Sequence, residues 1–158
     1  MGTWGTEFFD NDTAGDWADK FVKYGDISQL KRSIGLPLFD DVLTTYEVEE
    51  SLAAIYTIAC LQGYQFENSA YSEEVNQWVK ASQWPVPARM HNVCVYTLAH
   101  ILAYQDQIRE TWFKEEKFCE WRDRVQKMYD FLVAKEIKVL PDTRIKLTKE
   151  NPSLLIGK

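Results

Sequence analysis

The sequence is short of the residues that break helices and of those that form disulfides. It has 7 glycines and 5 prolines among 158 residues, below the about 12% that these two residues make up in average chains. This scarcity favours long helices and excludes collagen-like chains. The 3 cysteines are odd in number and widely spaced, which excludes a disulfide-stapled miniprotein and indicates free thiols in a reducing compartment.

Long hydrophobic runs are also missing. The longest stretches without a charged residue, 51–66 and 90–105, are shorter than the about 20 apolar residues that span a bilayer. The first residues show neither the basic nor the apolar segment of a signal peptide. We therefore expect a cytoplasmic protein without a membrane partner.

The chain is rich in aromatic residues, at 14% with 6 tryptophans, and its net charge of −6 is unevenly placed. Residues 1–79 hold 14 acidic and 4 basic residues, whereas residues 80–158 hold 10 and 14. The basic residues of 113–135 alternate with acidic ones, which is typical of an internally paired, solvent-exposed helix face. Such a face lacks the unbroken positive charge that phosphates require, so we expect no nucleic-acid partner.

Apolar residues recur at helical spacing through most of residues 1–135, which predicts an all-α domain, a single bundle of five or six helices. Asp12 or Thr13 is the expected N-cap of the first helix, and Gly25 is its expected end. The segment 52–61 has nine apolar residues in ten, which is typical of a central, buried helix. The expected helices start and end near residues 13–24, 27–34, 46–62, 72–83, 88–104 and 113–135.

Residues 136–158 form a C-terminal extension with a different pattern. Short β-like runs on either side of 140–143 are compatible with a small β-hairpin. The apolar run Leu154-Leu155-Ile156 has to pack or to contact a partner, which leaves a structural homo-oligomer open as one class of function.

The densest polar cluster, Asp10-Asn11-Asp12 with Asp16, invites comparison with a calcium loop. The loop template fails, however, because Ala14 and Phe21 occupy two of its ligand positions. Capping of a helix N-terminus explains the cluster better. The alternative is a hydrolase that uses a carboxylate of Asp10, Asp12 or Asp16, with or without a divalent metal.

Other catalytic and metal signatures are missing from the sequence. It has no Gly-x-Ser-x-Gly motif and no glycine-rich phosphate loop. His91 and His100 are nine residues apart on one expected helix, so they point in opposite directions and cannot share a metal ion. We expect no metal site and no cofactor.

The opening run Trp4-Gly5-Thr6-Glu7-Phe8-Phe9-Asp10-Asn11-Asp12-Thr13-Ala14-Gly15-Asp16-Trp17 resembles the start of a bacterial family called domain of unknown function 4259. Looser matches are the alanine-rich helix 50–63, the segment 107–112 and Trp121, so the resemblance covers about residues 1–135. Glu7 and Ile108 depart from the family pattern, which commonly has Gly and Leu there. The resemblance implies a small soluble helical protein, with no reaction to carry over. It singles out Trp4, Gly5, Phe9, Asp10, Asn11, Asp12, Ala14, Asp16 and Trp17 as a site or as a structural lock for the first helix, and the residue-level interpretation favours the lock.

Small size, an acidic N-terminal half and the lack of a catalytic signature favour a non-catalytic protein-binding module. Our hypothesis is an immunity-type or antitoxin-like protein that masks a basic partner protein, because charge complementarity speeds association and aromatic side chains anchor it. An acidic surface that only confers solubility is an equally simple explanation. The expected partner-binding residues are Asp40, Asp41, Tyr46, Glu47, Glu49 and Glu50, with Glu67, Tyr71, Glu73 and Glu74 nearby in sequence.

Overall fold

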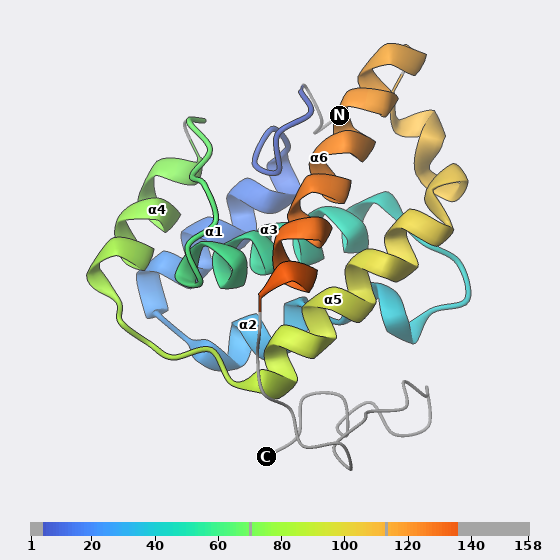
Figure 1. Ribbon diagram of the computed structural model, residues 1–158. Coiled ribbons are helices and arrows are strands. Elements are labelled where there is room, and N and C mark those ends of the chain that lie inside the picture. Colours follow the sequence, from blue (N-terminus) through green and yellow to red (C-terminus); the bar gives the residue numbers. More distant parts are fainter. Residues whose placement is uncertain (1–4, 70, 113, 136–158) are drawn as a thin grey trace.

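The computed structural model describes residues 5–69, 71–112 and 114–135. This part of the chain is a bundle of α-helices without β-strands (Figure 1), which confirms the predicted fold class. The expected hairpin, Trp4 and the Leu154–Ile156 run lie outside the described residues. The elements are α1 (Asp12–Tyr24), α2 (Ile27–Ser33), the 3-10 helix η1 (Leu36–Phe39), α3 (Thr45–Leu61), α4 (Ser72–Ala81), α5 (Ala88–Ala103), the 3-10 helix η2 (Gln105–Thr111) and α6 (Glu115–Ala134).

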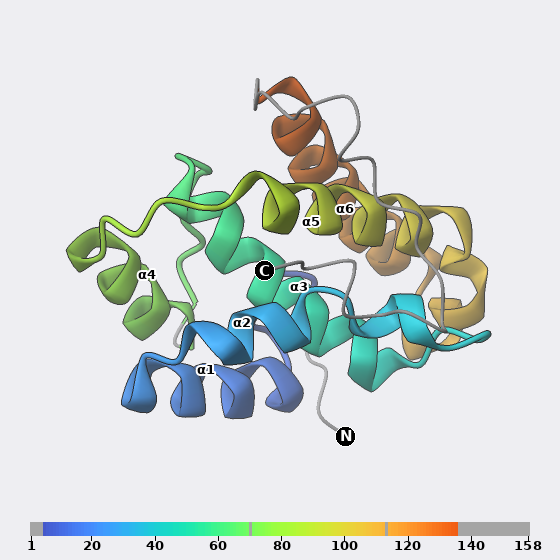
Figure 2. The same cartoon turned by 90° about the horizontal axis from the view of Figure 1, so that it is seen from below.

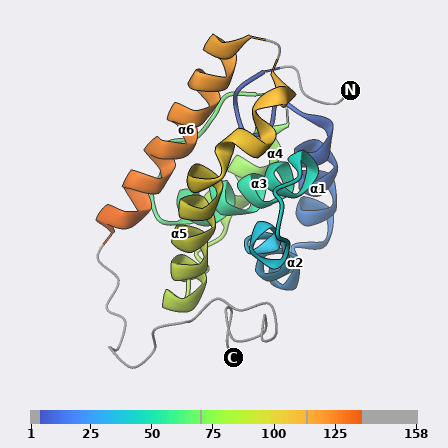
Figure 3. The same cartoon turned by 90° about the vertical axis from the view of Figure 1, so that its right-hand side faces the viewer.

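The helix α3 is the centre of the bundle, as its composition predicts. All ten residues from Ser51 to Cys60 are buried, and α1, α2, α4, α5 and α6 all pack against this helix. In Figure 3, α6 lies on one side of α3 and the pair α1 and α2 lies on the other. Because no face of this buried stretch is left for water, its polar groups need partners inside the protein.

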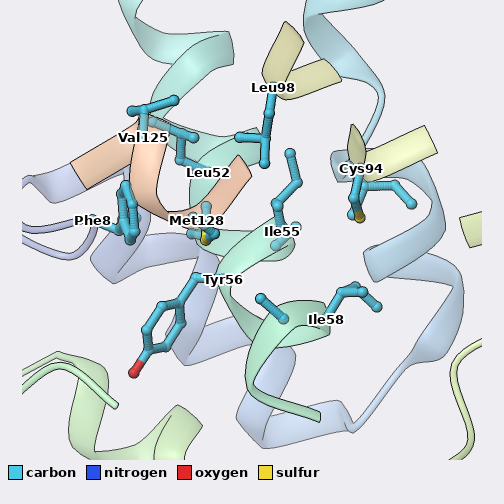
Figure 4. Packing of buried hydrophobic residues seen from close by; sticks show 14 of the residues in the cluster. Phe8, Leu52, Ile55, Tyr56, Ile58, Cys94, Leu98, Val125 and Met128 are labelled. Carbon is cyan, nitrogen blue, oxygen red and sulfur yellow. The ribbon is translucent and has the colours of Figure 1, made fainter. Parts of the chain in front are cut away.

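The apolar core joins α3 to α5 and α6. Leu52 and Ile55 lie between side chains of α5, such as Leu98, and side chains of α6, such as Val125 and Met128 (Figure 4). Tyr56 is the largest of the fully buried side chains, and its hydroxyl points out of the apolar cluster toward α4 (Figure 4). There it donates a 2.6 Å hydrogen bond to Asn76 Oδ1.

Most helix ends lie within two residues of their expected positions. Gly25 ends α1 in the left-handed conformation, at φ 58°, and donates its N–H to the carbonyl of Phe21, as expected for a glycine after a helix. The predicted N-cap of α1 is wrong, because Asn11 caps the helix and Asp12 is its first residue. No helix in the described ranges is long and apolar enough to cross a membrane.

The three cysteines are free. Cys60 and Cys94 are buried, whereas Cys119 is partly exposed. His91 is also buried, and its Nδ1 lies 3.0 Å from Gln62 Oε1. This contact gives the buried imidazole a hydrogen-bond partner inside the protein.

Candidate functional site

In the opening motif, the side chains of Asp10 and Asn11 bond to the backbone of neighbouring residues. Asn11 is 5% exposed; its Oδ1 accepts a 2.7 Å hydrogen bond from the Ala14 N–H, and its Nδ2 donates one of 3.1 Å to the Phe8 carbonyl. Asp10 Oδ2 accepts from the N–H of Glu7 at 3.1 Å and lies so close to Gly5 that a Cβ there would overlap the carboxylate. The residues 5–11, which we call the lead-in, are therefore a turn closed by its own side chains.

The lead-in is tied to three other parts of the fold. Phe9 is fully buried and packs edge-on against the Tyr56 ring, with centroids 5.3 Å apart. Thr6 Oγ1 donates to Glu120 Oε1 at 2.7 Å and accepts from Arg124 Nε at 3.1 Å. These contacts connect the lead-in to α3 and α6.

Glu67, which is partly buried, supplies the third tie. Its Oε2 accepts a 2.8 Å hydrogen bond from the Phe8 N–H, while its Oε1 is buried without a hydrogen-bond partner in the described structure. Burial raises the pKa of this carboxyl group to about 7, and the nearby carboxylates of Glu7 and Asp10 also raise it. A cavity of about 220 Å³ beside Glu67 is lined by Arg124 and Lys127.

A larger groove, with a volume of about 390 Å³, lies between α1, α2 and the start of α3. Figure 2 shows α1 and α2 side by side along this edge of the bundle. The groove brings together two sets of residues that lie far apart in the sequence. Asp16 and Trp17 come from the opening motif, and Tyr46 and Glu50 come from the expected partner surface. The full lining is Thr13, Asp16, Trp17, Lys20, Gln29, Arg32, Ser33, Tyr46 and Glu50.

The floor of the groove is built by a chain of hydrogen bonds. The Trp17 indole Nε1 donates to Ser33 Oγ at 3.0 Å, and Ser33 Oγ donates to Glu50 Oε2 at 2.9 Å. Gln29 Nε2 donates to the Trp17 carbonyl at 3.1 Å. Trp17 also stacks on Phe21, with centroids 5.0 Å apart. These contacts hold α1, α2 and α3 at a set separation.

The charges at the rim of the groove are largely without internal partners. The side chains of Asp16, Lys20 and Arg32 form no hydrogen bond or ion pair with any residue that the structure describes, and the Glu50 carboxylate bonds only to Ser33. Nothing in the sequence singles out Lys20, Arg32 or Ser33, because their proximity depends on how α2 packs against α1. The 3.6-residue period does place Asp16 and Lys20 on one face of α1.

An acidic cluster of Asp40, Glu47 and Glu50 adjoins the groove. The pKa of Glu47 is raised, first by partial burial, then by a hydrogen bond to Asp40 and by the charges of Asp40 and Glu50. Two large side chains that adjoin these residues in the chain are exposed, Tyr46 at 62% and Val42 at 59%. Exposed apolar groups among like charges are a feature of protein-binding surfaces.

The other expected partner-binding residues do not all share this surface. Asp41 is exposed next to Asp40, whereas Glu49 lines a small void of about 10 Å³ with Trp112 and Trp121 on another side of α3. Glu73 and Glu74 are exposed in the first turn of α4, which lies at the far end of α3 from Thr45 (Figures 1 and 2).

The carboxylates of the alternative hydrolase do not converge. Asp10 belongs to the lead-in and bonds to a backbone N–H, while Asp12 and Asp16 are exposed on α1. In the ranges that the structure covers, no three His, Cys, Asp or Glu side chains are arranged to hold a metal ion.

Together, the fold and the groove define a small all-α protein with a structural lead-in and an open polar groove. The model of the family Domain of unknown function (DUF4259) matches residues 2–124, and the chain belongs to this family. No curated protein and no solved structure matches it.

Proposed function

We propose that this protein is a non-catalytic protein-binding module that receives a basic region of a partner protein on its acidic cluster, as an immunity-type or antitoxin-like protein does. The observation that carries the proposal is that Asp40, Glu47 and Glu50 lie close enough to influence one another, and that Tyr46 and Val42, which adjoin them in the chain, have exposed side chains. The negative charge steers a basic partner toward the surface, and the apolar side chains anchor it.

The raised pKa of Glu47 supports this role. Keeping carboxylates side by side costs free energy in the unbound protein, because like charges repel. A cation of the partner placed between them removes that repulsion. The free cysteines suit a reducing compartment, so the proposal places the encounter in the cytoplasm.

The test compares two variants that each remove two negative charges. Asp40→Asn with Glu47→Gln alters the cluster, and Glu73→Gln with Glu74→Gln is the matched control on α4. The wild-type chain is immobilised at low salt to capture proteins from its native cell lysate, and the captured protein is then purified for affinity measurements.

We expect the control to bind the purified partner as the wild type does and the cluster variant to bind about tenfold more weakly, since two exposed ion pairs of up to about 1 kcal/mol each are lost. Affinity should also fall with rising salt. Equal binding by both variants, or a wild type that captures nothing, would contradict the proposal.

A further inference from the structure

The groove next to the acidic cluster contains charges of both signs. Asp16 and Glu50 supply carboxylates from α1 and α3, and Lys20 and Arg32 supply cations from α1 and α2. A site that only attracts a basic partner has no use for two cations beside its carboxylates, because each repels the partner.

These four side chains have not neutralised one another. None of them takes part in an ion pair in the described residues, although α1, α2 and α3 hold all four around one groove of about 390 Å³. On α6, by contrast, Lys117 pairs with Glu120 at 3.7 Å, and Arg122 pairs with Asp123 at 3.2 Å. The groove therefore presents two carboxylates and two cations that a bound protein can pair with.

We infer that the groove recognises a segment of the partner protein that carries one basic and one acidic side chain close together. The basic side chain pairs with Asp16 and Glu50, and the acidic one pairs with Lys20 and Arg32. Aliphatic portions of the segment pack on the ring of Tyr46 at the groove edge. This inference rests on the proposed function and narrows it, from a basic partner to one with a mixed-charge motif.

The inference depends on the Trp17–Ser33–Glu50 hydrogen-bond chain, which holds the groove open before the partner arrives. A preformed site loses little conformational entropy on binding, so even exposed ion pairs can add to its affinity. The hydrogen-bond chain also fixes the position of the Glu50 carboxylate relative to α1 and α2.

Reversing the two positive charges of the groove distinguishes a mixed-charge motif from a uniformly basic partner, because the affinity changes in opposite directions in the two cases. Lys20→Glu with Arg32→Glu makes the protein more acidic by four charges, which strengthens the binding of any uniformly basic partner. If the groove binds a mixed-charge motif, the same change removes both contacts to the acidic side chain and weakens binding. Lys23→Glu with Lys31→Glu is the control, since it makes the same change on the same two helices at residues outside the groove.

The probes are three blocked alanine-based peptides of equal length. One carries Arg and Glu four residues apart, one carries two Arg and one carries two Glu at the same positions. Binding to the full chain is measured by NMR, from the shift of the assigned Trp17 indole N–H, at peptide concentrations up to about 5 mM, because contacts worth a few kcal/mol give dissociation constants in the millimolar range.

We expect the Arg–Glu peptide to bind about tenfold more tightly than either of the others, and to lose about tenfold in Lys20→Glu with Arg32→Glu but not in the control. If the two-Arg peptide binds as tightly as the Arg–Glu peptide or more tightly, the mixed-charge motif is wrong. The same holds if the charge-reversed variant binds the Arg–Glu peptide more tightly than the wild type does. In both cases the proposal of a basic partner still stands. If no peptide shifts Trp17, the groove is not the recognition site. The basic-partner proposal is then decided separately by the Asp40 and Glu47 variant.

Discussion

The two sides of α3 use charged side chains in opposite ways. On the side of the lead-in and α6, Thr6 bonds to both Glu120 and Arg124, and Arg124 lies 3.8 to 3.9 Å from the carboxylates of Glu120 and Glu7. On the side of α1 and α2, the rim charges of the groove have no such partners among the described residues. Figure 3 shows α6 on one side of the central helix and the pair α1 and α2 on the other.

The contrast separates residues that hold the fold from residues that are available to a partner. A polar group buried with its partner is expensive to disturb, because its counterpart is then left without a hydrogen bond. An exposed charge without a partner contributes little to folding, so replacing it changes binding and leaves stability nearly as it was. The opening motif contributes to both sides, through Asp10 and Asn11 on one and Asp16 and Trp17 on the other.

The largest change in the free energy of unfolding is expected at Glu67, on the lead-in side of α3. Its pKa is raised from 4.5 to about 7 in the folded protein, so the folded state holds a proton that the unfolded state has already released. The stabilisation is complete below about pH 4.5 and is lost as pH rises through 7. Relative to Glu67→Gln, which does not titrate, the wild type should lose about 2–3 kcal/mol of unfolding free energy between pH 5 and pH 8.

Urea denaturation at a series of pH values measures this difference. Taking the difference between the two proteins cancels the titration of His91 and His100, whose pKa values are lowered by burial. Parallel curves for the wild type and Glu67→Gln would show that Glu67 titrates normally and that the lead-in side is less firmly closed than its contacts indicate.

Asn11 gives the next largest effect. Asn11→Ala removes the cap on the Ala14 N–H and the donor to the Phe8 carbonyl, which together should cost about 2 kcal/mol. Asp12→Ala is the control, because Asp12 is exposed and only its charge favours the helix N-terminus, by at most about 1 kcal/mol. Thermal unfolding of both variants decides between them, and a greater loss in Asp12→Ala would restore Asp12 as the important end residue.

The features that can be predicted from the sequence are those that depend on residues close together in the chain. The central place of α3 is predictable, since a helix with apolar residues on every face has nowhere else to lie. The cap of α1 is predicted one or two residues too late, because Asn, Asp and Thr all cap well and their order does not show where the backbone turns. The spacing of apolar residues therefore predicts the position of a helix better than it predicts the residue at which the helix begins.

The sites depend on long-range packing, which a single sequence does not show. Glu67 is partly buried, and its carboxyl group accepts a hydrogen bond from the N–H of Phe8, 59 residues earlier in the chain. The groove exists because Ser33 bonds to Trp17 and Glu50, across 16 and 17 residues. Tyr46 and Glu50 could be recognised as part of an acidic, aromatic surface, whereas Lys20 and Arg32 become informative only once α1 and α2 are placed side by side.

Replacing Ser33 tests whether the hydrogen bonds at the floor of the groove contribute to stability. Ser33→Ala leaves the buried Trp17 Nε1 without its acceptor, which should cost about 1–2 kcal/mol. Ser28→Ala, an exposed change in the same helix, should cost less. Urea denaturation compares the two variants, and equal stabilities would mean that the floor contributes nothing and that the groove is held open by apolar packing alone.

The smallest effect is expected at the rim, and it is the most direct check of the contrast between the two sides. Lys20→Gln with Arg32→Gln removes two charges that form no ion pair in the described structure, so the free energy of unfolding should change by no more than about 0.5 kcal/mol. Arg124→Gln removes only one charge, yet it should destabilise the protein more, because the Thr6 hydroxyl and the carboxylates of Glu7 and Glu120 all lose their shared cation. Urea denaturation at low and high salt measures both variants. If the double rim variant loses as much stability as Arg124→Gln, then Lys20 and Arg32 serve the fold after all, and the charges of the groove are not kept free for a partner.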